Sequence, residues 1–235
     1  MPDYRYIGDE LDLFARAKNW KAYWGTQIIP FLQGSVLEAG AGIGSNTRLL
    51  FNNKVRSWTC LEPDGRLLET LKLNLLRDPD LNHIQLVTGT LSDLEKSARF
   101  DSIIYIDVVE HIEKDKEELA LAASKLKKNG FLVVLSPAHP WLFSEFDASI
   151  GHFRRYTKKS LRSAGPPELK LCRLRYLDCC GLAASLANRL LLRQGMPTLS
   201  QIRFWDTFLV PPSRLLDPLS RYTAGKSVLG VWQKR

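Results

Sequence analysis

The sequence predicts an α/β fold: a doubly wound, mostly parallel seven-stranded sheet with helices on both faces and an antiparallel last strand. Short apolar runs alternate with segments of helical spacing about five times between residues 36 and 135, which is typical of repeated β-α units. The run at residues 102–106 is apolar throughout, as a strand covered on both faces would be. A final apolar run at residues 227–232 follows a long insertion and can return antiparallel to its neighbours.

The elements of the first half follow from this pattern in chain order. Residues 9–24 have helical apolar spacing, with Asp9 as N-cap and Glu10 close behind. Strands are expected at residues 36–37, 57–61, 84–87, 102–106 and 131–135. Helices are expected from Ser45, at residues 65–76 and at residues 113–127, and Gly130 marks the turn into the fifth strand.

The pattern changes after residue 136. Residues 137–157 form a long connection rich in Pro, His and aromatic residues, and such a loop in a compact domain is usually functional. Residues 170–176 alternate as a strand would, and residues 179–193 suit a helix that ends at the break at residues 195–198. A second helical stretch is expected at residues 200–209, ending before Pro211 and Pro212.

The length of 235 residues fits a single domain. We divide it into an N-terminal helical lid (1–30), a central core (31–136), an acceptor loop with a helical insertion (137–222) and a last strand (223–235). The N-terminus lacks a signal-peptide pattern, and no apolar stretch is long enough to span a bilayer, so we expect a cytoplasmic protein. The four cysteines include no CxxC pair, which leaves zinc and dithiol chemistry at cysteine unsupported.

Charge is distributed unevenly along the chain. Residues 1–150 contain 17 Lys and Arg against 21 Asp and Glu, whereas residues 151–235 contain 16 against 4. A basic C-terminal third can attract a phosphorylated or carboxylated small molecule, a nucleic acid or an anionic membrane. A solubilising surface explains the same composition, and the sequence leaves this choice open.

A glycine-rich turn lies between the first strand and the following helix. Gly40, Gly42 and Gly44 allow a sharp turn and let a ligand approach backbone N–H groups. A dinucleotide fingerprint would need its third glycine at Ser45, so an NAD site is disfavoured. Glu38 lies two residues before the first glycine. A tight turn without any ligand is the structural alternative.

The segment from Glu38 to Gly44 resembles motif I of the class I S-adenosylmethionine-dependent methyltransferases. The run from Asp107 to Ile112 is similar to the acidic-V-L-E-H-[IV] signature of such enzymes in ubiquinone and menaquinone biosynthesis. The resemblance covers residues 36–136 and implies a Rossmann-like methyltransferase fold, methyl transfer and S-adenosylmethionine as cofactor. It carries almost no information on the methyl acceptor.

The resemblance also implies which residues contact the cofactor. The turn from Glu38 and Ala39 through the glycines would hold its amino acid part, while Glu62, followed by Pro63, would accept from the ribose hydroxyls. Thr90 and Leu91 would pass the adenine ring, although the family's acidic residue is absent at Thr90. The remaining candidates are Asp107 and Val108 at the methionine end, His111 as a structural residue or a base, and Trp20 and Tyr23, with Tyr4 and Tyr6, in the N-terminal lid.

The loop at residues 137–157 supplies the candidates for the acceptor. His139, His152 or Tyr156 could remove its proton, Arg154 or Arg155 could clamp a phosphate or carboxylate, and Trp141 borders the expected pocket. In the alternative interpretation, both histidines hydrogen-bond the loop itself and the arginines pair with acids such as Glu145 and Asp147. No HxH or HxxxH spacing occurs, so we expect no metal.

The leading hypothesis is a methyltransferase acting on a small anionic or amphiphilic acceptor, with a peripheral membrane contact suggested by the apolar residues 181–192 and 204–215. An RNA methyltransferase would use the basic third, but nucleic-acid motifs such as N-P-P-[YF] are absent. A non-catalytic scaffold that binds the cofactor is a third hypothesis, against which the acids at positions 38, 62 and 107 argue.

Overall fold

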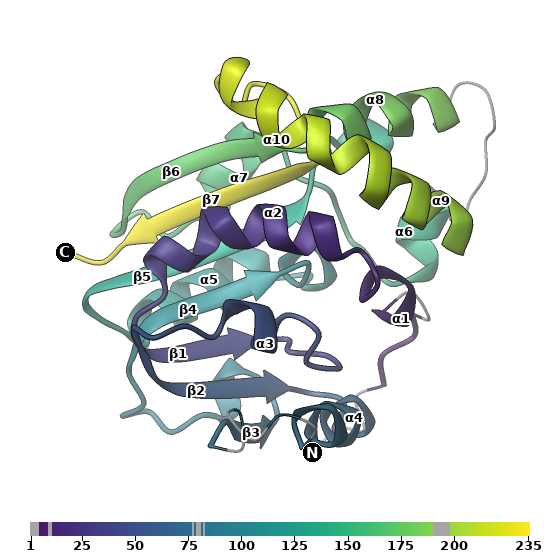
Figure 1. The fold of residues 1–235 in the computed structure, drawn as a ribbon. Helices are drawn as coiled ribbons and strands as arrows, with labels where there is room; N and C mark the ends of the chain where they lie inside the picture. The colour runs from purple at the N-terminus through teal and green to yellow at the C-terminus, as the bar shows by residue number, and fades with distance from the viewer. Residues whose placement is uncertain (1–4, 9–10, 77, 79–80, 82, 190–197) are drawn as a thin grey trace.

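The computed structural model describes residues 5–8, 11–76, 78, 81, 83–189 and 198–235 (Figure 1). Seven strands form one sheet in the order β3-β2-β1-β4-β5-β7-β6. β1 to β5 pair in parallel, and β7 is antiparallel to both β5 and β6, which confirms the predicted fold class. The strands are β1 (Gly34–Ala39), β2 (Val55–Glu62), β3 (Gln85–Thr88), β4 (Phe100–Ile106), β5 (Leu126–Pro137), β6 (Lys170–Leu177) and β7 (Ser227–Gln233).

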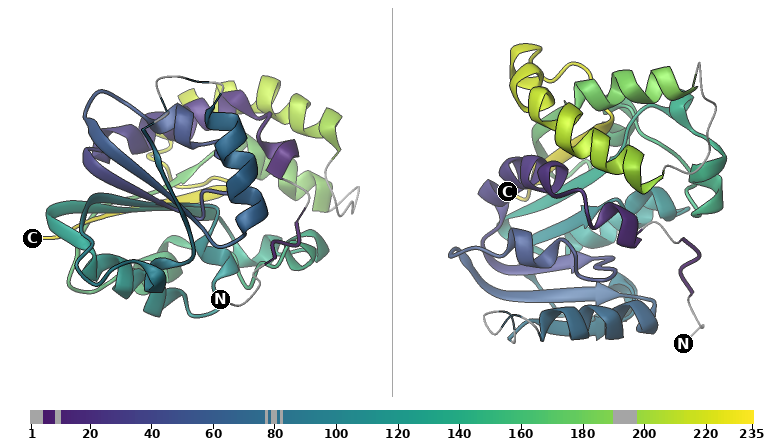
Figure 2. Two further views of the ribbon diagram at one scale, coloured as in Figure 1. Left: turned by 90° about the horizontal axis from the view of Figure 1, so that it is seen from below. Right: turned by 45° about the vertical axis from the view of Figure 1, so that its right-hand side comes forward.

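Two layers of helices enclose the sheet (Figure 2). The helices are α1 (Leu11–Phe14), α2 (Lys18–Ile28), α3 (Thr47–Leu50), α4 (Gly65–Leu75), α5 (Asp115–Ser124), α6 (Glu145–Ser149), α7 (Lys158–Ala164), α8 (Cys179–Ala187), α9 (Leu199–Phe204) and α10 (Val210–Leu219). Short helical turns are η1 (Ile29–Phe31), η3 (Leu91–Asp93), η4 (Val109–His111), η5 (Pro140–Leu142) and the π-turn η7 (Trp205–Leu209).

Alternate strand residues supply two hydrophobic cores, one on each face of the sheet. Val36 and Ile104 pack in the core that contains α2, α4 and η7, while Leu37 and Ile103 pack in the core that contains α5 and α7. This period of two follows from the pleat of a strand. Both faces are apolar because both are covered, as the sequence of the central strands predicted.

The predicted N-terminal helix at residues 9–24 is divided into α1 and α2, and α2 continues to Ile28. The Asp206 carboxylate causes the restart, since it accepts hydrogen bonds from the backbone N–H groups of Asn19 and Trp20 at 3.1 and 2.8 Å. These N–H groups have no partner within a helical first turn, so a distant carboxylate serves as their cap. Asp9 and Glu10 lie outside the described residues.

The second C-terminal helix does not end before Pro211 and Pro212, as the sequence analysis expected. The chain passes through the π-turn η7 and continues as α10, whose first turn contains both prolines. Proline is tolerated there because a first-turn residue has no helical acceptor for its N–H. Elsewhere α3 starts at Thr47 rather than Ser45, and β5 already begins at Leu126 and runs through Gly130.

The buried side chain of Asp217, on α10, connects this helix to α2 and to the start of α8. Its carboxylate accepts from the hydroxyl of Tyr23 at 2.6 Å and from the backbone N–H groups of Asp178 and Cys179 at 2.6 and 3.0 Å. These donors belong to α2 and to the start of α8, while Asp217 itself belongs to α10. The carboxylate therefore fixes the helical cover over one edge of the sheet.

Replacing Asp217 with alanine should lower the free energy of unfolding by about 3 kcal/mol, because three buried donors lose their acceptor together. Chemical denaturation followed by circular dichroism measures this. The matched control is Glu69→Ala on α4, where an exposed acid is removed and a change within about 0.5 kcal/mol is expected. Equal losses in the two variants would contradict the role given to Asp217.

Candidate cofactor and acceptor site

A large cavity opens at the carboxyl edge of the sheet. β1, β2 and β4 point toward the side of the molecule where α1, α6 and α9 lie (Figure 1). The cavity has a volume of about 1590 Å³ and is lined by the N-terminal segment, the glycine turn, the strand ends, the loop after β5 and parts of α8 and α9. A single small-molecule site takes roughly 300–1,000 Å³, so this cavity has room for two ligands side by side.

The glycine turn follows β1 with left-handed backbone at each glycine. The φ values are +68° at Gly40, +55° at Gly42 and +76° at Gly44. A Cβ at Gly40 would lie 2.6 Å from Cγ2 of Val108, and one at Gly44 would lie 2.8 Å from Cγ of Leu71. Packing therefore requires glycine at positions 40 and 44, in addition to the φ values there. Gly40 and Gly42 also line the cavity, together with Ala39.

Glu38 lies beneath this turn and does not reach the cavity wall. Its side chain is 2% exposed and accepts from the hydroxyl of Thr47 at 2.7 Å and from Nε1 of Trp58 at 3.1 Å. Burial raises the pKa of the Glu38 carboxyl to about 7, although both hydrogen bonds oppose the rise. The sequence analysis expected Glu38 to contact a ligand directly. The structure instead places its carboxylate beneath the glycine turn, where it supports the turn.

Glu62 ends β2 and lines the cavity. Its carboxylate accepts from the backbone N–H of Gly42 at 2.8 Å and from that of Asp64 at 3.0 Å. Burial raises the pKa of Glu62. The two oxygens of a carboxylate offer about four acceptor sites, so acceptance from further hydroxyls is compatible with these bonds. Pro63, Thr90 and Leu91 line the cavity beside it.

Asp107 follows β4 in a left-handed conformation with φ of 53°. Such strain in a residue other than glycine is characteristic of functional positions. Asp107 and Val108 line the cavity, and burial among protein groups raises the pKa of Asp107 to about 6. Lys21 also lines the cavity, where its Nζ donates to the hydroxyl of Ser45 at 2.7 Å.

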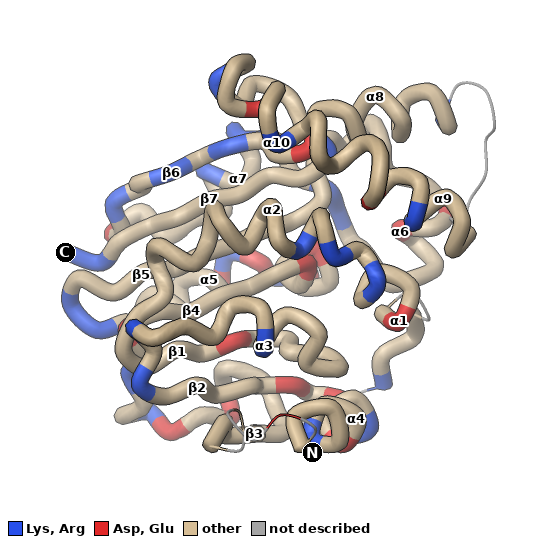
Figure 3. The backbone as a smooth tube through the Cα atoms, viewed as in Figure 1, with Lys and Arg blue, Asp and Glu red and all other residues tan. Residues whose placement is uncertain are grey.

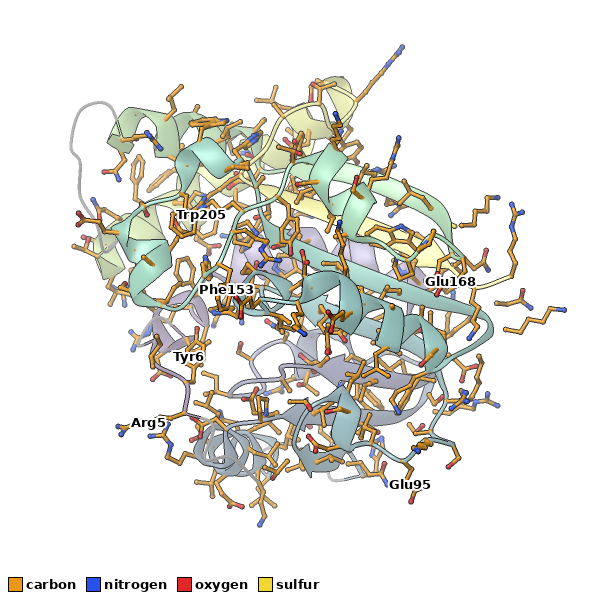
Figure 4. The ribbon with its side chains drawn as sticks, turned by 180° about the vertical axis from the view of Figure 1, so that it is seen from behind. Arg5, Tyr6, Glu95, Phe153, Glu168 and Trp205 are labelled. Carbon is orange, nitrogen blue, oxygen red and sulfur yellow. The ribbon has the colours of Figure 1, made fainter. Side chains whose placement is uncertain are left out.

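The N-terminal candidates divide between the cavity and the core. Trp20 lines the cavity. Tyr23 does not line it, and its hydroxyl donates to the carboxylate of Asp217. Tyr6 lines the cavity and packs edge-on against His111, with ring centroids 5.7 Å apart. Tyr4 lies outside the described residues. Figure 4 shows Tyr6, Phe153 and Trp205 on one side of the molecule, and all three belong to the cavity wall.

Two of the acceptor-loop candidates reach the cavity, His152 and Arg155. Nδ1 of His152 and Nε of Arg155 each lie 2.8 Å from Oδ1 of the buried Asp147. This carboxylate has a pKa well below its usual range, because the hydrogen bonds from His152 and Arg155 outweigh its desolvation. It orients both side chains, and Nε2 of His152 faces away from it.

The other loop candidates are held away from the cavity, which corrects the expectation that they surround the acceptor. Tyr156 is buried and donates to Asp115 at 2.7 Å, and Arg154 pairs with the same Asp115 carboxylate at 2.8 Å. Nε2 of His139 lies 3.0 Å from the carbonyl oxygen of Gly225. Trp141 is 46% exposed and is not part of the cavity wall. These groups hold the loop in place.

Sequence reasoning missed several charged residues of the cavity, among them Lys21, Glu110 and Lys226. Lys226 immediately precedes β7, and its Nζ lies 4.4 Å above the ring of Trp205. Because β7 is antiparallel, its first residues meet the carboxyl ends of β1 to β5. Because the sequence analysis predicted this antiparallel strand, it could have placed Lys226 at the carboxyl edge of the sheet.

Comparison with known proteins agrees with this geometry. Residues 37–132 match a family described as a methyltransferase domain. No curated protein matches the chain.

Solved structures share the fold at low identity. An S-adenosylmethionine-dependent methyltransferase from Clostridium acetobutylicum is 12% identical, with 96% of this chain and 95% of that chain covered and a TM-score of 0.61. A geranyl diphosphate methyltransferase in complex with S-adenosylmethionine is 11% identical over 96% and 90%, with a TM-score of 0.64. Coclaurine N-methyltransferase is 14% identical over 99% and 76%, with a TM-score of 0.61.

The matched segment runs from β1 into β5 and contains the glycine turn, Glu62 and Asp107. The structural matches add that the whole chain has the fold of such enzymes. The chain therefore contains a match to a methyltransferase domain over residues 37–132 and has, along its whole length, the fold of S-adenosylmethionine-dependent methyltransferases.

Proposed function

We propose that the protein is an S-adenosylmethionine-dependent methyltransferase that methylates a small anionic amphiphile. The observation that carries this proposal is the combination of Arg155 and Lys226 with an apolar wall in one cavity that also contains the cofactor-binding turn. Ala184, Ile202 and Phe204 from α8 and α9 contribute to that wall. Cationic groups suit a phosphate or carboxylate, and the wall suits an apolar body.

In this proposal the cofactor lies along the strand ends from β3 to β4. Thr90 and Leu91 flank the adenine, Glu62 accepts from the ribose, and Gly40 and Gly42 approach the amino acid part. Asp107 faces the methionine end, where its charge attracts the ammonium and the sulfonium. Trp20 covers the sulfonium with an aromatic face, and Glu38 supports the turn from below.

Methyl transfer then needs an aligned nucleophile and little else. The nucleophile forms a bond to the methyl carbon as the bond from that carbon to sulfur breaks, which leaves S-adenosylhomocysteine. In-line positioning and exclusion of water contribute much of the rate. A hydroxyl or amine acceptor also loses a proton, and His152 is the loop histidine that lines the cavity near Asp107.

Each region of the chain has a separate role in this proposal. Residues 31–136 bind the cofactor, residues 1–30 cover it, and residues 137–222 surround the acceptor before the strand at residues 223–235 completes the sheet.

The arrangement of basic residues also argues for a small acceptor over RNA. Lys and Arg gather along β6 (Figure 3), but Arg173 donates to the carbonyl oxygen of Gln27 at 2.9 Å and lies 4.7 Å from the ring of Phe31. Arg175 lies 4.1 Å from the ring of Tyr222. These guanidinium groups stabilise the last two strands, so much of the basic third is engaged within the protein.

An apolar surface beside the cavity supports a peripheral membrane contact. Phe204, Phe208, Leu215 and Leu219 on the segment from α9 to α10 are between 57% and 80% exposed. Arg203 and Arg214 lie on the same segment. Apolar and cationic side chains together suit the surface of an anionic bilayer, from which an amphiphile could enter past Phe204. Among the described residues no helix is both long and apolar enough to cross a membrane.

The cofactor proposal predicts a selective effect of Asp107→Asn. Affinity for S-adenosylmethionine should fall about tenfold, because a charge near the sulfonium is lost, while affinity for S-adenosylhomocysteine should fall less. Isothermal titration calorimetry with both ligands measures this. Glu95→Gln, which removes an exposed acid away from the cavity, should leave both affinities unchanged. Equal losses for both ligands in Asp107→Asn would argue against the proposed position of the sulfonium.

The affinity for S-adenosylmethionine should also depend on pH. Protonation neutralises Glu38 and Asp107, whose pKa values are raised to about 7 and about 6, and the cationic cofactor favours their ionised forms. Affinity should therefore be greatest above pH 7 and decline as the pH falls through both values. Titrations between about pH 8 and about pH 5.5 test this, and a constant affinity across that range would contradict it.

The membrane contact predicts binding to anionic vesicles. The protein should sediment with phosphatidylglycerol vesicles but not with phosphatidylcholine vesicles, and added salt should release it. Phe208→Asp should reduce this binding roughly tenfold, because one large apolar group no longer enters the bilayer. Leu73→Asp on α4 is the control, since Leu73 is 61% exposed but lies on another element. Indifference to anionic vesicles would remove the membrane contact from the proposal.

A further inference from the structure

Three ligand-type side chains meet at the wall of the cavity although they come from two distant segments. Glu110 and His111 belong to η4 after β4, and His152 belongs to the loop after α6. One carboxylate oxygen and two imidazole nitrogens lie within 4.8 Å of one another. The rings of His111 and His152 meet edge to face, with centroids 4.5 Å apart. All three residues line the cavity.

Glu110 provides an independent sign that a ligand is bound here. Its side chain is fully buried, and its Oε2 accepts from the hydroxyl of Ser136 at 2.7 Å. Its Oε1 has no hydrogen-bond partner among the described residues and lies 4.0 Å from Nε2 of His152. A buried carboxylate oxygen without a donor is costly unless a cation or proton satisfies it.

The nitrogen of His152 that faces away from Glu110 is already occupied. Nδ1 of His152 lies 2.8 Å from Asp147 Oδ1, and His111 is hydrogen-bonded to the backbone at Ile150 and Gly151. Histidines that bind metals are oriented in this way, by a carboxylate or a carbonyl on the nitrogen that does not bind. Asp147 thus holds Nε2 of His152 toward Glu110.

We propose that Glu110, His111 and His152 bind a divalent transition-metal ion such as Zn²⁺. Two imidazoles and one carboxylate form one of the ligand sets of open zinc sites, which keep a position for water or substrate. Tetrahedral ligands at about 2.0 Å from zinc lie roughly 3.3 Å apart, so ligand atoms that now lie within 4.8 Å of one another need to close by at most about 1.5 Å on binding. Nε2 of His152 and Oε1 of Glu110, which lie 4.0 Å apart, are within about 0.7 Å of that separation.

The sequence predicted no metal because it contains no closely spaced histidine pair. The fold supplies instead an adjacent Glu-His pair and a third ligand about 40 positions later, brought together by the backbone N–H of Phe153, which donates to the carbonyl oxygen of Glu110 at 2.8 Å. The open metal position faces the cavity. Resting on the proposed function, the metal would bind an oxygen of the acceptor and lower the pKa of that oxygen, so His152 would bind the metal rather than take the proton itself.

Metal binding can be measured without knowledge of the acceptor. Protein dialysed against a chelator should bind one equivalent of Zn²⁺ in calorimetry, and Co²⁺ in its place should give the intense visible absorption of a four- or five-coordinate site. Glu110→Gln and His152→Gln should each abolish stoichiometric binding. Asp147→Asn, which alters only a positioning residue, should weaken it 10- to 100-fold. His83→Ala is the matched control, because His83 is exposed and packs against Phe51.

Binding of S-adenosylhomocysteine serves as the test of folding for every variant. Absence of zinc binding to the wild-type protein, or undiminished binding in Glu110→Gln and His152→Gln, would overturn the metal site if S-adenosylhomocysteine still binds. That result would leave methyl transfer intact with His152 as the group near the acceptor. Failure of S-adenosylhomocysteine to bind the wild-type protein would instead reject the proposed function.

Discussion

The two hydrogen bonds that the Glu62 carboxylate accepts connect the turns that line the cavity at the carboxyl edge of the sheet. One donor is Gly42 in the turn after β1, and the other is Asp64 in the turn after β2. A single buried carboxylate therefore fixes the distance between two neighbouring strand-to-helix turns. Asp64 extends the connection, because its own carboxylate accepts from the backbone N–H of Tyr6 at 2.9 Å. The N-terminal segment is thereby attached across the mouth of the cavity.

Carboxylates also organise the opposite side of the cavity. Asp206 caps α2, Asp217 joins α2 to α8 and α10, and Asp147 orients His152 and Arg155. Asp206 and Asp217 accept from donors that are distant in sequence, whereas the donors to Asp147 lie five and eight residues further along the chain. All three carboxylates give their contacts a direction that hydrophobic packing alone lacks. The cavity can be large because its walls are fixed by these directional bonds rather than by side chains that fill it.

The sequence predicted the sheet well because β1 to β5 alternate with helices and the central strands β1 and β4 are covered on both faces. It predicted the glycine turn because the left-handed φ values of Gly40, Gly42 and Gly44 exclude most other residues. It could not predict which loop candidates reach the cavity. Tyr156 and Arg154 both contact Asp115 on α5, and that contact depends on how the loop after β5 folds back on the sheet. Lys226 and Glu110 escaped notice because their significance lies in tertiary neighbours rather than in spacing.

The charges of the cavity are balanced in a way that bears on its chemistry. Asp107, Glu110 and Asp147 bring carboxylates to the cavity, where burial raises the pKa of Asp107 and the positive charges of Arg155 and Lys226 oppose that rise. A cationic cofactor would pair with the carboxylates of the cavity, and an anionic acceptor would pair with its cationic side chains. Without these ligands, charges of like sign would repel one another at low dielectric constant. Transfer of the methyl group removes the positive charge of the sulfonium, and it removes the charge of the acceptor as well where the anionic group is itself the nucleophile. The fixed charges of the cavity then attract the products less strongly than the reactants, which favours release of the products.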